Sequence, residues 1–167
     1  MLQVGLGDQV DIEAPVVSLT SHQPGSYLSG QVTLSGVARD DKEITSLSIT
    51  LDGGTNWQSV EAIDAEEEQW SFPLDTESMT DGRIRVLLRA GDGAGKVTIT
   101  DELVFSIDNT APVLLVTGPR DYGTRAFNTL VSVDVAASDV HPIKHFGIEI
   151  FDESGNALGD PVEVEQA

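Results

Sequence analysis

Cysteine is absent from this chain of 167 residues, which excludes disulfide bonds, thiolate metal sites and a cysteine nucleophile. Basic residues are scarce as well, because 9 lysines and arginines face 28 aspartates and glutamates and leave a net charge of −19. Such an acidic chain disfavours nucleic acid and anionic lipid as partners and favours cations, Ca²⁺ first among them. The alternative is that the charge serves solubility alone.

Long hydrophobic runs are missing too. No apolar stretch approaches the length of roughly 18 residues that a membrane span needs, and no signal peptide opens the chain, so we expect no membrane insertion in this segment. Helical apolar stripes are also absent. Alternation with a period of two residues dominates instead and predicts strands throughout, with ample hydrophobic content for a core.

A repeat organises the chain. Residues 14–20 (Ala-Pro-Val-Val-Ser-Leu-Thr) return at 111–117 as Ala-Pro-Val-Leu-Leu-Val-Thr, and later matches keep an offset between 97 and 99 residues. This period is too long for a solenoid unit and suits a whole small β-domain used in tandem. We predict a complete domain over residues 11–110, a partial second copy over 111–167, and the last strand of a preceding domain within 1–10.

The first copy contains seven predicted strands separated by turn residues such as Asp52-Gly53-Gly54. They are 16–19, 31–38, 44–51, 57–63, 69–72, 84–90 and 97–107. Seven short strands with regular turns predict an all-β, immunoglobulin-like antiparallel β-sandwich, although a closed barrel or propeller blade also fits the pattern.

The second copy contains four predicted strands, 113–117, 128–137, 143–151 and 161–165, and has no counterpart of residues 83–107. A half-sandwich exposes sheet edges and half of a core. We therefore expect it to pair with something or to be marginally stable. One hypothesis is that the N-terminal strand of another copy fills it.

Several motifs resemble those of the bacterial immunoglobulin-like domains that occur in tandem in large exported proteins. The resemblance rests on the opening Ala-Pro motif, on residues 51–57 (Leu-Asp-Gly-Gly-Thr-Asn-Trp), on 89–95 (Arg-Ala-Gly-Asp-Gly-Ala-Gly) and on 105–112 (Phe-Ser-Ile-Asp-Asn-Thr-Ala-Pro). It implies a stalk, spacer or adhesive unit of surface and secreted proteins, in some cases with Ca²⁺ at the joints between domains. The second copy departs from the pattern at residues 151–156, which lack a tryptophan like Trp57.

Carboxylates beside the two Ala-Pro linkers are the candidate metal ligands. The chain of such a sandwich enters at the end that carries the loops between strands two and three and between strands six and seven. We expect Asp11 and Glu13 to approach residues of those loops, and Asp108 and Asn109 to approach Asp139. The full candidate set is Asp11, Glu13, Asp40, Asp41, Asp92, Asp108, Asn109 and Asp139. Oxygen ligands of this kind suit Ca²⁺, and the alternative is that they only cap turns.

Other candidate sites favour structural interpretations. Trp57 and Trp70 could form a platform for a sugar ring, but large aromatic residues of β-sandwiches pack more often in cores. Residues 50–57 resemble the Asp-box hairpin of sialidases and other propellers, yet the motif occurs once, so Asp52 is expected only to cap its turn. Adjacent acids at 66–68 predict a solvated loop.

No catalytic constellation is found in the sequence. His22, His141 and His145 lack the spacing of a metal or general-base site, and no nucleophile elbow, phosphate loop or zinc motif occurs. We therefore predict a non-catalytic structural or adhesive module of a large bacterial surface or secreted protein, with neighbouring domains and an extracellular protein or glycan as partners. The alternatives are an accessory domain of a secreted polysaccharide-active enzyme, which positions or binds its substrate, and a cytosolic scaffold.

Overall fold

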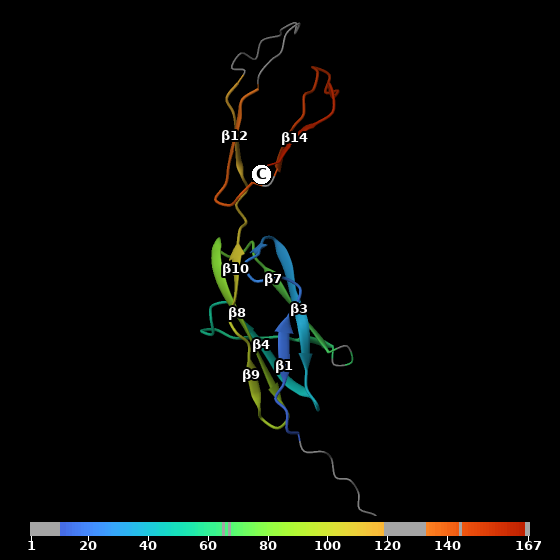
Figure 1. The fold of residues 1–167 in the computed structure, drawn as a ribbon, viewed down its shortest axis with the longest axis vertical. Coiled ribbons are helices and arrows are strands. Elements are labelled where there is room, and N and C mark those ends of the chain that lie inside the picture. The colour runs from blue at the N-terminus through green and yellow to red at the C-terminus, as the bar shows by residue number, and fades with distance from the viewer. Residues whose placement is uncertain (1–10, 65, 67, 119–132, 144, 166–167) are drawn as a thin grey trace, which may run out of the picture. The chain divides into compact units, whose positions relative to one another are not determined.

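The computed structural model describes residues 11–64, 66, 68–118, 133–143 and 145–165 (Figure 1). Contacts divide the chain into two compact units, Met1–Asn109 and Thr110–Ala167, and each is described by itself. Every regular element among the described residues is a strand, and no helix suited to crossing a membrane occurs among them. The predicted strand within residues 1–10 and the first half of the one predicted at 128–137 lie outside the described residues.

The first unit consists of two sheets. Its strands are β1 (Val16–Leu19), β2 (Tyr27–Leu28), β3 (Gln31–Arg39), β4 (Ile44–Thr50), β5 (Gln58–Ser59), β6 (Ala62–Asp64), β7 (Gln69–Asp75), β8 (Gly82–Asp92), β9 (Val97–Ile99) and β10 (Leu103–Ile107). One sheet has the order β1-β3-β7-β6, and the other has the order β2-β10-β8-β4-β5 with β9 also paired to β8 (Figure 1). All pairs between these strands are antiparallel except β2 with β10. The predicted immunoglobulin-like β-sandwich is confirmed.

The core lies between the two sheets. Alternate residues of β3 and β8 point inward, as their period-two pattern predicts, and Leu34, Val86 and Leu88 are completely buried. Trp70 of β7 is also buried, and its indole Nε1 donates a hydrogen bond to the carbonyl oxygen of Ser18 in β1 at 3.1 Å. This bond ties the first strand of the domain to the centre of its sheet.

Two predicted strands prove to be broken, each for a local reason. The segment predicted at 57–63 pairs with β4 through β5 and through the backbone N–H of the buried Val60, and then continues in the other sheet as β6. The segment predicted at 97–107 is interrupted at Thr100, whose hydroxyl oxygen accepts the Leu88 N–H at 3.0 Å in place of a backbone carbonyl. Side-chain chemistry therefore ends β9 and lets β10 begin in a new register.

The second unit contains two separate ladders. Strand β11 (Val113–Val116) pairs with β12 (Val135–Ser138), and β13 (His145–Ile148) pairs with β14 (Val162–Glu165), both antiparallel. The four residues of β11 are each more than half exposed. The ladders follow the strand order of the start of the first unit, but they do not enclose a buried core among the described residues.

Candidate cation site

Three of the predicted ligands meet where the N-terminal linker reaches the first sandwich. Asp11 lies in the linker, Asp40 follows β3, and Asp92 ends β8. One carboxylate oxygen of each lies within 4.8 Å of the others. The loops that hold Asp40 and Asp92 are those between β3 and β4 and between β8 and β9. That these carboxylates bind an ion stays a prediction.

A lysine that the sequence did not suggest bridges two members of this acidic cluster. The Lys96 ammonium donates to Asp11 Oδ1 at 2.5 Å and to the Asp11 carbonyl oxygen at 3.0 Å, and it lies 3.4 Å from Asp92 Oδ2. The hydrogen bond to Asp11 is the largest cause that raises the pKa of Lys96. The linker is thus anchored to the β8–β9 turn by a charged side chain rather than by backbone alone.

Asp92 is the buried member of the cluster, with 5% of its surface exposed. Burial by itself raises the pKa of this carboxyl, but hydrogen bonds from the backbone N–H and the ammonium of Lys96 outweigh it, and the net effect lowers the pKa. Asp92 is therefore charged at neutral pH and depends on Lys96 for compensation.

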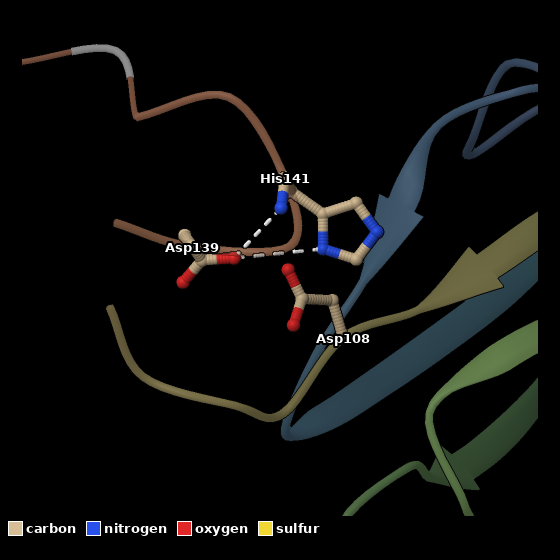
Figure 2. Close-up of side chains that lie close together, drawn as sticks. All are labelled: Asp108, Asp139 and His141. Atoms are coloured by element: carbon tan, nitrogen blue, oxygen red, sulfur yellow. Dashed lines mark hydrogen bonds and ion pairs between the residues drawn. The ribbon is translucent and has the colours of Figure 1, made fainter. Parts of the chain in front are cut away.

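Asp40 has one oxygen engaged and one unengaged. Its Oδ1 accepts the backbone N–H of Lys42 at 3.0 Å, whereas its Oδ2 is buried and has no hydrogen-bond partner. The same turn recurs in the second unit, where Asp139 Oδ1 accepts the backbone N–H of His141 at 2.8 Å and lies 3.8 Å from His141 Nδ1 (Figure 2). Turn capping explains Oδ1 of both aspartates but leaves Asp40 Oδ2 unexplained.

The remaining predicted ligands take other positions. Glu13 and Asp41 are exposed and line a pocket of about 250 Å³ together with Arg39. The predicted approach of Asp108 and Asn109 to Asp139 spans the two units and stays a prediction.

Asn109 has a role in the first unit that the sequence did not suggest. Its Oδ1 accepts the Gly30 N–H at 3.0 Å and lies 3.0 Å from the hydroxyl of the buried Thr76, while its Nδ2 donates to the Thr76 carbonyl oxygen at 2.7 Å. Its backbone N–H donates to Asp81 Oδ1 at 2.8 Å. The C-terminal linker is therefore anchored by an amide, and binding an ion through Asn109 Oδ1 would require exchange of these partners.

Asp52 caps the turn after β4, as predicted. Its Oδ1 accepts the backbone N–H groups of Thr55 and Asn56, each at 2.9 Å, and Asn56 Nδ2 donates to Oδ2 at 2.6 Å. These bonds, with the backbone bond from Asn56 the largest, lower the pKa of Asp52 to about 2. Gly53 in this turn has a φ of +73°, where a Cβ would lie 2.8 Å from the Arg85 guanidinium.

The same cap recurs in the second unit at Asp152, which the sequence comparison missed. Asp152 Oδ1 accepts the backbone N–H groups of Ser154 and Asn156, each at 2.8 Å, and the Asn156 amide donates to Oδ2 at 2.9 Å. Bonding from the Asn156 side chain lowers the pKa of Asp152. The spacing from aspartate to asparagine is identical in the two turns and would have revealed the match.

The two tryptophans do not form a common surface. Trp70 lies in the core, whereas Trp57 is half-buried on the outside of the sandwich, with the Arg89 guanidinium carbon 4.5 Å from its ring centroid. Its indole Nε1 donates to the Gly54 carbonyl oxygen at 3.1 Å. The predicted core position is correct for Trp70, and a cation–π contact covers part of Trp57.

The two packed sheets and the buried tryptophan define an immunoglobulin-like module. The family described as Bacterial Ig domain matches residues 15–100, just over half of the chain, and the chain belongs to this family. The search of curated proteins found no match to this chain.

Two solved structures illustrate the similarity. The endo-β-1,4-mannanase from Thermotoga petrophila is 18% identical with a TM-score of 0.49, and the match covers 63% of this chain but only 22% of that one. The fibronectin(III)-like modules of Clostridium thermocellum CbhA are 12% identical with a TM-score of 0.48, and that match covers 90% of this chain and 78% of the other.

Proposed function

We propose that this chain is a non-catalytic structural or adhesive module of a large bacterial surface or secreted protein, and that it sets the spacing between neighbouring domains. The observation that carries the proposal is the anchoring of both linkers at opposite ends of β8. Asp11 is held by Lys96, just beyond the last residue of β8, and Asn109 is held by Asp81, just before the first. Membership in the bacterial Ig family supports an extracellular location.

The length of β8 gives the spacing a scale. This strand has 11 residues, and an extended strand rises by about 3.3 Å per residue, so the two anchors are separated by roughly 35 Å. Each anchor uses a side chain with several hydrogen bonds. These bonds restrict rotation of the linker where it joins the sandwich. The module would therefore behave as a spacer of fixed length.

Stretching the chain between its ends tests this proposal. We expect the first unit to open in one discrete step that lengthens the chain by about 30 nm, which is the contour of the released residues less the folded length. Asn109→Ala should lower the opening force, whereas Gln58→Ala, at an exposed site away from both anchors, should not. Gradual extension without a step, or hydrolysis of polysaccharide substrates by the purified chain, would contradict the proposal.

Calcium at the N-terminal joint is the second part of the proposal. Support comes from three carboxylates within 4.8 Å of one another and from the buried, unpartnered Oδ2 of Asp40. Ca²⁺ prefers six to eight oxygen ligands, so backbone carbonyls or water would have to complete the set. The Lys96 ammonium already compensates Asp11 and Asp92, and Ca²⁺ would have to displace it.

Competition between Lys96 and Ca²⁺ is testable by thermal melting. Millimolar Ca²⁺ should raise the midpoint of the wild type slightly relative to EDTA, and Lys96→Met should enlarge this shift because it removes the competing ammonium. Arg83→Met is the control, since that exposed basic side chain lies at the other end of β8 from the three carboxylates. Equal midpoints with and without Ca²⁺ in both wild type and Lys96→Met would remove the calcium proposal and leave the spacer proposal intact.

A further inference from the structure

We propose that the outer face of the sheet β2-β10-β8-β4-β5 in the first unit binds an acidic polysaccharide. Arginines of β8 hold carboxylates of the polymer, and the rings of Tyr27 and Trp57 stack on its sugars. This inference goes beyond the spacer proposal, which rests on the two linkers and does not depend on any glycan.

Three arginines lie on this face. Arg83, Arg85 and Arg89 are exposed side chains of β8, and the strand alternates them with buried residues such as Val86 and Leu88. They are three of the nine basic residues in a chain with a net charge of −19. The other strands of this sheet, β2, β10, β4, β5 and β9, contain no acidic residue. Positive charge is therefore concentrated on one face of an otherwise acidic molecule.

Two of the guanidinium groups can accept a ligand carboxylate without rearrangement of the backbone. Arg85 Nη1 lies 3.6 Å from Glu102 Oε2, and the two side chains are 57% and 42% exposed. A pair this exposed contributes little to stability, so a ligand carboxylate can take the place of Glu102. The Arg89 guanidinium carbon lies over the ring of Trp57, 4.5 Å from its centroid. Because the N–H donors of a guanidinium lie in its plane, this contact at its face leaves them available to a carboxylate.

Aromatic rings lie at both edges of the same face. Strands β2 and β5 are the edges of this sheet. Tyr27 of β2 is 55% exposed and faces Ser106, which in turn faces Arg83. Trp57 directly precedes β5 and contacts Arg89, so the two rings flank opposite ends of the arginine row. The negative face of an aromatic ring attracts the C–H groups of a sugar ring. A chain of sugars that crosses the sheet from one ring to the other therefore passes over the arginines.

The spacing of the arginines favours a polysaccharide over nucleic acid. Arg83 and Arg89 are six residues apart in β8, which is about 20 Å along an extended strand. Duplex DNA carries one charge per about 1.7 Å, far denser than the three arginines over this length. A polymer with one carboxylate on each sugar, or on every second sugar, has more widely spaced charges. Serine hydroxyls beside the arginines, with Ser48 facing Arg89 and Ser106 facing Arg83, offer hydrogen bonds to sugar hydroxyls.

The net negative charge of the chain does not prevent such binding. At physiological ionic strength the Debye length is about 8 Å, so carboxylates on remote loops are largely screened from this face. A ligand at contact distance is therefore attracted mainly by the arginines beneath it. Its affinity should fall as the salt concentration rises, because salt screens this attraction as well.

Binding of polygalacturonate to the full chain tests the proposal. Isothermal titration calorimetry at physiological ionic strength, with EDTA present to exclude bridging by Ca²⁺, should detect binding of this polymer. The methyl-esterified polymer has the same sugars without the charges, and it should bind at least roughly tenfold more weakly because charge-assisted hydrogen bonds are lost. Equal affinity for both polymers, or binding of neither, overturns the proposal and leaves the spacer proposal to its own stretching test.

Matched variants locate the site on this face. Arg83→Gln and Arg89→Gln should each weaken binding of polygalacturonate roughly three- to tenfold. Tyr27→Ala should weaken it without any change of net charge. Arg39→Gln is the control, because this exposed arginine lies on β3 in the other sheet and its loss changes the charge equally. An equal loss of binding in Arg39→Gln overturns the proposal, since the total charge would then explain the binding.

Polyglutamate distinguishes a glycan from an acidic polypeptide as the occupant of this face. At equal carboxylate concentration it should bind at least roughly threefold more weakly than polygalacturonate, because it has no sugar faces to stack on Tyr27 and Trp57. Comparable affinity for the two polymers overturns the assignment to a polysaccharide and identifies the face as a general site for polyanions.

Discussion

The two units of this chain share their local structure and differ in closure. Their first ladders have the same register, and aspartates with an asparagine four residues later cap the corresponding turns. Yet the first unit buries residues such as Ile49 and Phe105 completely, while the second leaves Leu114 and Phe151 more than half exposed. Register and turn chemistry are therefore properties of short segments, whereas burial requires strands that only the first unit has among the described residues.

One position shows how closure constrains the sequence. Gly36 of β3 approaches β1 so closely that a Cβ would lie 2.0 Å from the Ser18 carbonyl oxygen, the atom that accepts the Trp70 hydrogen bond. Its counterpart in β12 is Val135, which faces Val116 as Gly36 faces Leu19. The closed unit needs glycine where the open unit accommodates a β-branched side chain.

The largest expected effect is a difference in the free energy of unfolding between alanine substitutions at two corresponding isoleucines, Ile49 and Ile148. Ile49→Ala should reduce the free energy of unfolding of the first unit by about 2–5 kcal/mol, because the completely buried side chain leaves a cavity. Ile148→Ala should cost less than about 1 kcal/mol, since its side chain already meets solvent. Urea unfolding of both variants measures the difference. Similar losses would mean that the second unit is as closed as the first.

Gly36→Ala should come next. The added methyl group has to push the β1 backbone away, and overpacking of this kind costs about 1–3 kcal/mol. Urea unfolding followed by tryptophan fluorescence measures the loss, because both tryptophans lie in the first unit. Val135→Ala, at the matching place in β12, should change the transition of the first unit by no more than error. A neutral Gly36→Ala would show that β1 is less tightly held than its hydrogen bonds indicate.

Substitution of the capping asparagines should have smaller and matching effects. Asn56→Ala and Asn156→Ala each remove hydrogen bonds to the aspartate of the turn, and local hydrogen exchange should become roughly tenfold faster in each hairpin. Gln58→Ala, an exposed change beside the first turn, is the control. A response in only one hairpin would break the equivalence of the two caps.

Acid should have the smallest effect. The two carboxylate caps stay intact at neutral pH and lose their contribution to stability only when the aspartates are protonated. Asp52 has its pKa lowered from 3.8 to about 2, so its stabilising contribution is complete above about pH 4 and is lost as the pH falls through about 2. The pKa of Asp152 is lowered for the same reason. Titration of the side-chain carboxyl signals by NMR measures both. An ordinary pKa at Asp52 would exclude the cap in solution.

The alternation of apolar residues was sufficient to predict the sandwich and most of its strands, because the period of two determines which residues face the core. It did not predict the break at Thr100, since one hydroxyl replaces one carbonyl there without changing the alternation. It also missed the parallel pairing of β2 with β10, because two residues are too few for a periodic signal. Pairing partners distant in sequence leave no local trace.

The candidate site was predictable in part for the same reason. The positions of the loops in the predicted sandwich were sufficient to expect Asp11, Asp40 and Asp92 near one another. Lys96 was missed because its ammonium reaches Asp11 across 85 residues, and a single lysine in a turn has no distinctive pattern. The Asn109 anchor was missed because asparagine beside Asp108 suggests a ligand set as readily as an amide that bonds to backbone. The sequence shows which carboxylates attract a cation, but it does not show whether a metal ion or a lysine side chain is their partner.

The Asn109 anchor has a consequence for synthesis of the chain on the ribosome. Asn109 bonds Gly30, which lies 79 residues earlier, so the closing contact of the first unit cannot form until nearly the whole module has emerged. Domains that emerge first also fold first, and nascent sheets with open edges are prone to misassembly with neighbours. The late position of Asn109 in the chain therefore prolongs the time during which the first unit has open edges.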